Sequence, residues 1–469
     1  MAYKAPVWED GNSPAISAEN LNDISQTLEG AQILWGNNPP TSSTKGAVGQ
    51  FYLVVIADSN GHFPLYQCVG ISSTAYNWKL FEFASKYVSS AVASLLGLGT
   101  GATVEDALLV LGTPSAGSGI LRVSCVDSDG KAVSGCVVQV GSIWGISTTA
   151  GSVTFELGAG DYSVSVLSPI DYGMESQTFN VNIPLSESVT LTATIVDSLS
   201  GATELRVTNS VTRAAFSGRV ITADVFCVGG GGSGASYRRY PNNNKSASAS
   251  GGAGGYTKMK TNISLELPLT LTIGSGGAAV AVSDTQDGAK SGNAGGTTKV
   301  VDMLGNTILS APGGAGGNTG TDRVAGAAGG SGSGGVMLLS GTFYVGASGQ
   351  DGASGGVGYS ASYGPGGAGQ GTTTRLWQQS SGELFSSAGG SAIASVDTYG
   401  EKTGTAGTGA GAAYAMNNPN TIGDLSAGSA TTYGSGGGGI AVLDDASSGA
   451  YSSGAGKQGL IVFRWEVSA

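Results

Sequence analysis

Two short patterns in this sequence match motifs that enzymes use for chemistry. The peptide Gly352-Ala-Ser-Gly-Gly356 fits the pattern G-x-S-x-G of a serine nucleophile, which needs a strand–turn–helix context and a histidine partner. The only histidine is His62, far away along the chain. The peptide Gly454-Ala-Gly-Lys-Gln-Gly459 fits G-x-G-x-x-G, but it precedes a strand-like run rather than a helix, the reverse of a dinucleotide site. We interpret both as chance matches and expect neither enzyme activity nor a cofactor.

Carboxylates and cysteines also fail to form a catalytic or metal-binding pattern. Paired carboxylates could cleave a polysaccharide, and acidic residues are scattered from Asp284 to Asp445. No repeating β-helix coil accompanies them, so we interpret them as turn residues, although pairs formed only in space stay an alternative. The four cysteines have spacings that match neither a zinc site nor a dense disulfide framework. The turn Asp127-Ser-Asp-Gly130 lacks the ligand spacing of a calcium loop. We expect no metal.

Tyrosine, arginine and tryptophan in the last part of the chain are the candidates for binding. Ten of the 17 tyrosines lie after residue 196, among Ser, Gly and Asn. Tyrosine with small polar residues is typical of evolved binding loops, and Arg and Trp are favoured anchors. A solvated loop tip at 237–240 and a local core around Trp377 are the alternatives. The predicted receptor-binding residues are Tyr237, Arg238, Arg239, Tyr240, Tyr359, Tyr363, Trp377, Tyr414 and Tyr433.

The overall charge and hydropathy exclude several kinds of partner. Only 11% of the 469 residues are charged, and the formal net charge is −11. Binding to a phosphate backbone needs clustered Lys and Arg, which the sequence lacks, so we expect no nucleic-acid partner. No apolar stretch reaches the roughly 18 residues of a membrane span, and the start lacks the apolar run of a signal peptide. We therefore expect synthesis in a cytoplasm and no membrane insertion.

The pattern of elements predicts a mostly β, multi-domain, elongated protein with short helices near its start. Apolar residues at helical spacing predict helices over 16–29, 83–96 and from Thr103 onward, and a strand run at 51–57 followed by 65–69 predicts a small β module. About seven short alternating strands then predict a compact β-sandwich, with a hairpin turn at Gly158–Asp161. The predicted domains are an N-terminal segment (1–33), the β module (34–82), a helical connector (83–116), the sandwich (117–196) and a glycine-rich domain (197–469).

Glycine marks the last domain boundary, because 61 of the 82 glycines follow residue 196. Strand-like runs at 219–228, 267–273, 298–301 and 460–465 frame long glycine clusters. Glycine in regular structure costs about 0.5–1 kcal/mol relative to alanine, so the clusters are either disordered tethers or places where backbones pack closely. We favour polyglycine II helices lying side by side and held by inter-chain backbone hydrogen bonds, because a tether has no use for the flanking strands and the tyrosines.

Several segments resemble known proteins. Val7-Trp-Glu-Asp-Gly11 with Pro14–Asn22 resembles the start of bacteriophage tail-fibre proteins and of related phage-tail-like bacteriocins. The sandwich, with Gly151–Phe155 and Gly158–Tyr162, resembles carboxypeptidase-regulatory and collagen-adhesin B-type spacers. The last domain is similar to the glycine-rich domain of phage tail adhesins; the matching pieces are Asp224–Gly232, Gly251–Tyr256, Leu271–Gly277, Gly295–Thr298 and Gly459–Phe463.

The resemblance implies a receptor-binding fibre of a phage tail or of an extracellular tail-like particle. In such fibres the first segment attaches to a tail or baseplate protein, and the tip binds a bacterial surface glycan or protein receptor. Fibres of this kind are commonly homotrimers, which suits the narrow apolar stripe of the first predicted helix. The insertions at about 318–360 and 375–450 match no motif. A capsule or cell-wall polysaccharide depolymerase and a secreted bacterial adhesin are the alternatives.

Overall fold

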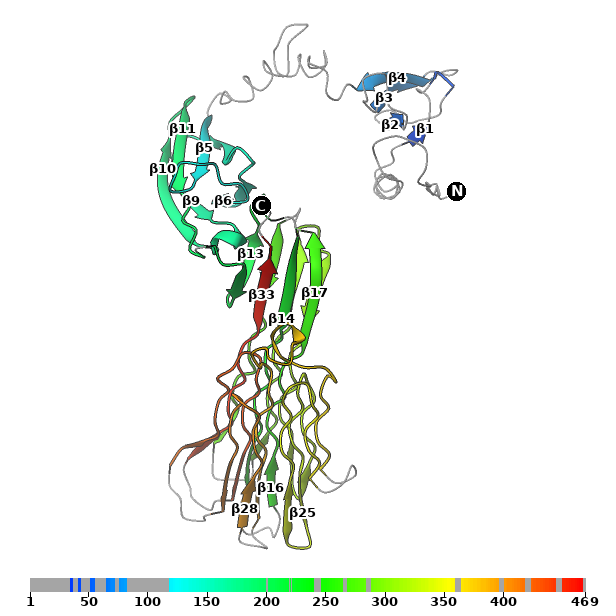
Figure 1. Ribbon diagram of the computed structural model, residues 1–469, viewed down its shortest axis with the longest axis vertical. Coiled ribbons are helices and arrows are strands. Elements are labelled where there is room, and N and C mark those ends of the chain that lie inside the picture. The colour runs from blue at the N-terminus through cyan, green and yellow to red at the C-terminus, as the bar shows by residue number, and fades with distance from the viewer. Residues whose placement is uncertain are drawn as a thin grey trace. The chain divides into compact units, whose positions relative to one another are not determined.

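The computed structural model describes most of the chain after residue 117 and a few short pieces before it (Figure 1). The described residues are 34–36, 41–43, 51–54, 65–71, 76–81, 118–199, 201–218, 220, 222–239, 246–264, 268–283, 288–358, 364–395, 400–417, 423–443 and 449–466. The chain divides into two compact units. One comprises Met1–Ile120, Glu156–Ala159 and Ile183–Val189, and the other comprises Leu121–Phe155, Gly160–Asn182 and Thr190–Ala469.

Strands dominate the described residues, which contain two short 3₁₀ helices and no α-helix. The prediction of a mostly β protein built from several sheets is confirmed. The predicted helices over 16–29, 83–96 and from Thr103 onward lie outside the described residues. In the part of the chain that the structure describes, no helix has the length and apolarity to cross a membrane.

Four strands form the first sheet, within the predicted β module. Strand β1 pairs with β2 in parallel, whereas β2 pairs with β3 and β3 with β4 in the antiparallel sense. The observed β2 and β3 lie at the predicted strand runs. The strands are β1 (Leu34–Gly36), β2 (Phe51–Val54), β3 (Leu65–Ile71) and β4 (Tyr76–Phe81).

Seven strands between residues 118 and 194 form two sheets, in agreement with the predicted sandwich. One sheet has the order β10-β9-β6-β7 and the other β11-β5-β8. Alternate residues of the strands are buried, as the period of two along a strand requires; Val164 and Val166 of β9 are fully buried. The strands are β5 (Ser118–Val126), β6 (Val137–Val140), β7 (Ile143–Ile146), β8 (Ser152–Gly158), β9 (Gly160–Leu167), β10 (Ser176–Ile183) and β11 (Ser188–Thr194).

The predicted hairpin at Gly158–Asp161 is wrong. Strands β8 and β9 follow each other with one residue between them, but they belong to different sheets. The connection therefore passes from one sheet of the sandwich to the other. Alternation along each strand indicates which side chains are buried, but it does not specify the pairing partner, because the same inward pattern suits both sheets.

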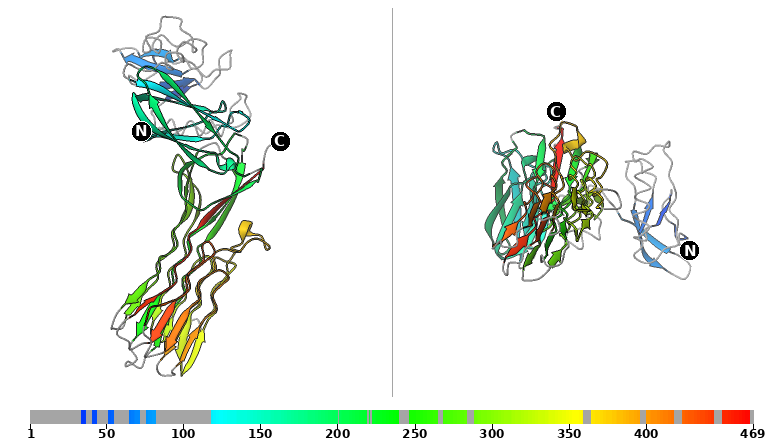
Figure 2. Two further views of the ribbon diagram at one scale, coloured as in Figure 1. Left: turned by 90° about the vertical axis from the view of Figure 1, so that its left-hand side faces the viewer. Right: turned by 90° about the horizontal axis from the view of Figure 1, so that it is seen from below.

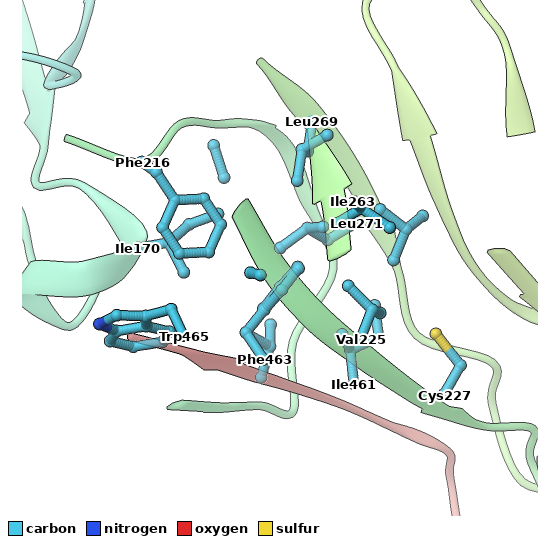
Figure 3. Close-up of a cluster of buried hydrophobic side chains, with 14 of the residues drawn as sticks. Ile170, Phe216, Val225, Cys227, Ile263, Leu269, Leu271, Ile461, Phe463 and Trp465 are labelled. Carbon is cyan, nitrogen blue, oxygen red and sulfur yellow. The ribbon is translucent and has the colours of Figure 1, made fainter. Parts of the chain in front are cut away.

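Two four-stranded sheets begin the glycine-rich domain and enclose its main apolar core (Figure 3). In the first sheet the last strand, β33, lies between β12 and β14 and pairs antiparallel with both. Phe216 contacts the rings of Phe463 and Trp465 edge-on, with centroids 5.5 and 5.6 Å apart. The sheets are β12-β33-β14-β17 (Glu204–Val207, Leu460–Trp465, Thr222–Val228, Thr257–Ser264) and β13-β18-β21-β22 (Val211–Ala214, Leu269–Thr272, Thr298–Asp302, Thr307–Ala311).

Beyond these sheets the chain runs back and forth in extended segments that form no strands (Figures 1 and 2). We call them the glycine lattice. Backbone hydrogen bonds between the segments recur every third residue: Gly229, Gly232 and Ala235 donate to the carbonyls of Tyr256, Ala253 and Ser250. The segments are 229–235, 250–256, 274–280, 291–297, 312–318, 325–328, 332–335, 346–350, 353–358, 364–370, 386–391, 404–407, 411–413, 427–431, 435–439 and 453–459.

Segment 229–235 has six neighbours around it. Its N–H groups donate to segments 250–256, 291–297 and 453–459 in turn, and its carbonyls accept from segments 274–280, 312–318 and 435–439. Three residues per turn and backbone groups that point outward are the properties of the polyproline II family of helices. The lattice is therefore a bundle of polyglycine II helices, as we expected for the glycine clusters, with the hydrogen bonds between segments of one chain.

Burial repeats with the same period of three. In segment 312–318, Gly314 and Gly317 are buried while Pro312, Ala315 and Asn318 are exposed. Segments 229–235, 250–254 and 386–391 are buried at every position, because neighbours surround them. The non-glycine residues of segment 312–318 thus take the one position in three that faces solvent.

Close approach of backbones explains why glycine occupies the buried positions. A Cβ atom on Gly231 would lie 2.0 Å from the carbonyl oxygen of Ser435, and one on Gly232 would lie 2.1 Å from that of Ala315. Such separations are far below van der Waals contact, so no other residue fits without moving a neighbouring segment. The entropy that glycine loses on ordering is offset by hydrogen bonds that other residues would block.

At the far end of the lattice the segments become strands again and form four small sheets (Figure 1). These are β20-β15-β31-β29 (Gly288–Lys290, Ser236–Arg239, Ile440–Leu443, Tyr414–Asn417), β23-β16-β27-β28 (Thr319–Gly320, Ser246–Ala249, Ala392–Ser395, Gly400–Thr403), β19-β32-β30 (Ala281–Ser283, Ala450–Ser452, Leu425–Ser426) and β24-β25-β26 (Arg323–Val324, Val336–Leu339, Thr342–Val345).

The helix η1 (Ile170–Tyr172) joins the sandwich to the glycine-rich domain. Ile170 belongs to the apolar core shown in Figure 3, and its N–H donates to the carbonyl of Ala215 over 2.8 Å. The fully buried carboxylate of Asp171 accepts hydrogen bonds from the N–H of Ser217 at 2.7 Å and from its hydroxyl at 2.5 Å. These contacts make this part of the sandwich continuous with the glycine-rich core.

We expect Gly314→Ala to destabilise the glycine-rich domain. Its Cβ atom would lie 2.3 Å from the carbonyl oxygen of Ala253, and overpacking of this kind costs about 1–3 kcal/mol. The measurement is the free energy of unfolding in denaturant. The matched control is Ala315→Ser at the adjacent, solvent-facing position, which should leave stability unchanged. Equal stability of the two variants would contradict the close packing of the lattice.

We expect Asp171→Ala to lower the melting temperature, because the N–H and hydroxyl of Ser217 lose their buried acceptor. An unsatisfied buried donor costs about 1–3 kcal/mol. Asp129→Ala, at an exposed turn of the sandwich, is the control for loss of a carboxylate. Calorimetry of the full chain measures both, and similar melting curves would rule out a stabilising junction at Asp171.

Candidate functional site

The structure places three of the predicted receptor-binding residues in the interior. Tyr237, Arg238 and Arg239 lie in β15, which pairs with β20 on one side and β31 on the other. Arg238 is fully buried with its guanidinium 5.4 Å from the ring centre of Tyr451, and Arg239 Nη1 donates to the Tyr237 hydroxyl over 3.2 Å. The alternative of a solvated loop tip at 237–240 is wrong for Tyr237, Arg238 and Arg239, because these residues form a strand between two others and their side chains are buried.

Trp377 also lies in a core, in the helix η3 (Leu376–Gln378), and the local-core alternative is confirmed. The indole packs 5.9 Å from the ring of Phe226, under the guanidinium of Arg464 at 4.3 Å. Its Nε1–H donates to Glu204 Oε2 over 3.0 Å. The segment around Trp377 and Phe385 therefore covers one face of the sheet β12-β33-β14-β17.

The other predicted residues divide into two groups. Tyr414 and Tyr433 are half-buried and pack against separate apolar clusters, and the ammonium of Lys457 lies 5.9 Å from the ring centre of Tyr433. Tyr240, Tyr359 and Tyr363 lie outside the described residues. The structure thus brings none of the described candidates together on one exposed surface.

Both enzyme-like motifs lie in the glycine lattice. Ser354 accepts a hydrogen bond from the N–H of Gly369 through its hydroxyl, and Gly352 follows a turn with a positive φ of 75°. In the other motif, Gly454 donates to the carbonyl of Gly438 as part of the lattice, and the segment continues into β33. Among the described residues no three His, Cys, Asp or Glu side chains are grouped so that they could hold a metal ion.

The strongest candidate for a functional surface is the end of the glycine-rich domain where its strands turn back. We call it the loop end. It is defined by the strand termini that pair or run in parallel there: Arg239, Leu443 and Asn417 end parallel strands side by side, and Ser395 pairs with both Ser246 and Gly400. Figure 1 shows β16, β25 and β28 at this end. Strands far apart in sequence therefore end together here.

The hairpin of β25 and β26 is a fully described turn of the loop end. Leu339 pairs with Thr342 across a two-residue loop of Ser340 and Gly341, whose φ angles are +48° and +78°. Two positive φ angles in succession are those of a type I′ turn, which matches the twist of the paired strands. Leu339 is 36% exposed, and Ser340, Gly341 and Thr342 are also exposed.

Charged and amide side chains hold the neighbouring strands in place. Lys402 Nζ donates to the carbonyl of Phe343 over 3.3 Å, and so joins β28 to the hairpin. Glu401 Oε2 accepts from the N–H of Asn417 over 2.6 Å, while Asn417 Nδ2 donates to the carbonyl of Ser395 over 2.9 Å. The loop end therefore offers an exposed leucine among small polar groups, on strands that these hydrogen bonds hold together.

Sequence reasoning missed this hairpin, although a signal was present. The Ser-Gly pair at 340–341 lies between two short runs of strand-forming residues, which is a recognised hairpin pattern. The hairpin lies in the insertion at about 318–360, which matches none of the segments that resemble phage adhesins. The composition of binding sites favoured large aromatic residues such as Tyr237 and Trp377 instead. In this protein those large side chains stabilise the ends of the lattice.

Comparisons with known proteins give one family. A family model described as a glycine-rich domain matches residues 208–466, more than half of the chain. No curated protein matches the chain. Among solved structures, the Bacillus anthracis TIE protein is similar at 11% sequence identity with a TM-score of 0.17; the match covers 48% of this chain and 46% of that one, so the chain spans less than half of that protein's length.

Proposed function

The chain belongs to the glycine-rich domain family, and on that premise we propose that it is the receptor-binding tip protein of a phage tail or of a tail-like particle. In this proposal the loop end contacts a glycan or protein on a bacterial surface. The N-terminal segment, with its resemblance to tail-fibre starts at 7–22, attaches to a tail or baseplate protein. The site of action is then a virion tail or an extracellular particle.

The observation that carries the proposal is the way the lattice holds the loop end. Each described strand there continues into an extended segment of the lattice whose backbone groups bond to neighbours. Binding loops on such a frame lose little conformational entropy when a receptor binds, and preorganisation of this kind increases affinity. The described turn at Ser340 and Gly341 is exposed, so its sequence can vary without disturbing the lattice.

The proposed role is binding without catalysis. The alternative is a depolymerase that cleaves capsule or cell-wall polysaccharide. The two are separated by incubating the full chain with purified polysaccharide from a strain that it binds and measuring new reducing ends. Multiple turnovers would establish the depolymerase and overturn the binding-only proposal.

We expect Leu339→Asp to weaken binding to bacterial cells about tenfold, which corresponds to about 1.4 kcal/mol. The charge would be placed at the exposed apolar point of the β25–β26 hairpin. The measurement is adsorption of the labelled full chain to a strain that the wild-type chain binds. The melting temperature of the variant should be unchanged, because Leu339 lies at a turn.

The matched control is Leu304→Asp. Leu304 is 72% exposed in the turn between β21 and β22, and segment 312–318 of the lattice separates that turn from the loop end. This variant should bind cells like the wild type. Undiminished binding by the Leu339 variant would remove the hairpin from the receptor site, and failure of the wild-type chain to bind any strain of a broad panel would contradict the proposal itself.

We also propose that three copies of the chain assemble. Three tips on one fibre would raise the effective concentration of each binding site for receptors on the same cell. Light scattering at micromolar concentration should give three times the mass of one chain. The mass of a single chain would contradict the trimer. It would not bear on the proposed binding function, which the adsorption experiment tests separately.

A further inference from the structure

Two cysteines meet in the interior of the sandwich. Cys125 lies near the end of β5, in the sheet β11-β5-β8, and Cys136 directly precedes β6 of the other sheet. Both side chains are fully buried, and they lie close enough for each thiol to shift the pKa of the other. A bond between these sulfur atoms would therefore connect the two sheets.

The backbone brings the two residues together by a specific route. The turn at Asp127–Gly130 reverses the chain, since Asp127 Oδ1 accepts from the N–H groups of Asp129 and Lys131. The N–H of Val133 then donates to the carbonyl of Cys125 over 2.9 Å. Cys136 follows three residues later, with its thiol 3.8 Å from the carbonyl of Val133.

We propose that Cys125 and Cys136 are a redox-active pair that forms an intersheet disulfide when the protein meets an oxidising environment. The pair is reduced in this structure. The inference does not depend on the identity of a receptor or on the trimer. The disulfide would join the two sheets of the sandwich covalently. The spacing of 11 residues between the two cysteines did not predict it.

The reaction is a thiol–disulfide exchange with a small disulfide such as oxidised glutathione. The Cys125 thiolate attacks one glutathione sulfur, which forms a mixed disulfide and releases one glutathione thiolate. The Cys136 thiolate then attacks the Cys125 sulfur, which forms the protein disulfide and releases the second glutathione. The two protein thiols lose two protons and two electrons, and oxidised glutathione gains both to become two glutathione thiols.

The environment distinguishes the two thiols. The hydrogen bond from Cys136 lowers the pKa of Cys125, whereas that same hydrogen bond and burial raise the pKa of Cys136. Cys125 is thus the thiol that ionises first, and thiolate is the attacking form. Because both groups are buried, oxidation proceeds through transient opening of the sandwich edge near the 127–130 turn.

Cys227 is an internal comparison. It is fully buried in the apolar core of Figure 3, and burial raises its pKa. Cys227 forms no hydrogen bond with another cysteine among the described residues. The same oxidant should leave it as a free thiol.

The test exposes the folded full chain to oxidised glutathione, quenches with acid, unfolds the protein, blocks free thiols with a maleimide and digests with trypsin without reduction. Cleavage after Lys131 separates the two cysteines, so a disulfide is detected as peptide 123–131 joined to peptide 132–206. We expect this linked pair, its disappearance after reduction, and a maleimide-labelled Cys227.

Thermal unfolding gives a second readout. Oxidation should raise the melting temperature of the wild type, because the cross-link restricts the unfolded chain, and a reducing agent should reverse the rise. The rise should be absent in Cys125→Ala and in Cys136→Ala, each compared with itself before oxidation. Maleimide labelling of both cysteines after prolonged oxidation, or a linked peptide that joins either one to Cys227, would overturn the proposal.

Discussion

The backbone hydrogen bond between neighbouring extended segments is the interaction on which the glycine-rich domain depends. Each segment turns once every three residues, so its N–H and carbonyl groups point in different directions around its axis and reach up to six neighbours. The separation that allows these bonds leaves no space for a Cβ atom at positions such as Gly231 and Gly232. Glycine is therefore structural here, and the alternative of a disordered tether does not apply to the described segments.

The two ends of the lattice carry different kinds of core. At one end, sheets with a conventional apolar core join the first and last strands of the domain, with β33 between β12 and β14. At the other end, short strands carry the turns, and their interior is filled mainly by alanines with Tyr237 and Leu443. Large aromatic residues thus lie in the cores at the ends, where the strands leave room for side chains.

The sandwich shares structure with the domain that follows it. Ile170 enters the glycine-rich core, and Asp171 satisfies two polar groups of Ser217 across the junction. Arg213 adds a cation–π contact, with its guanidinium 4.4 Å from the ring centre of Trp144. A spacer connected only by a linker would lack such contacts, so the part of the sandwich around Trp144, Ile170 and Asp171 packs directly on the glycine-rich domain.

The sequence by itself determined the strand-rich character, the strands at 51–54, 222–228 and 460–465, and the use of glycine for close packing, because periodicity and composition are local properties. Only the tertiary structure decided which segments pair. It assigned β8 and β9 to different sheets and buried Arg238 and Trp377. Those outcomes depend on partners distant in sequence, such as Val442 beside Arg238 and Phe226 beside Trp377, and a pattern of side chains along one segment carries no information about which distant backbone will lie against it.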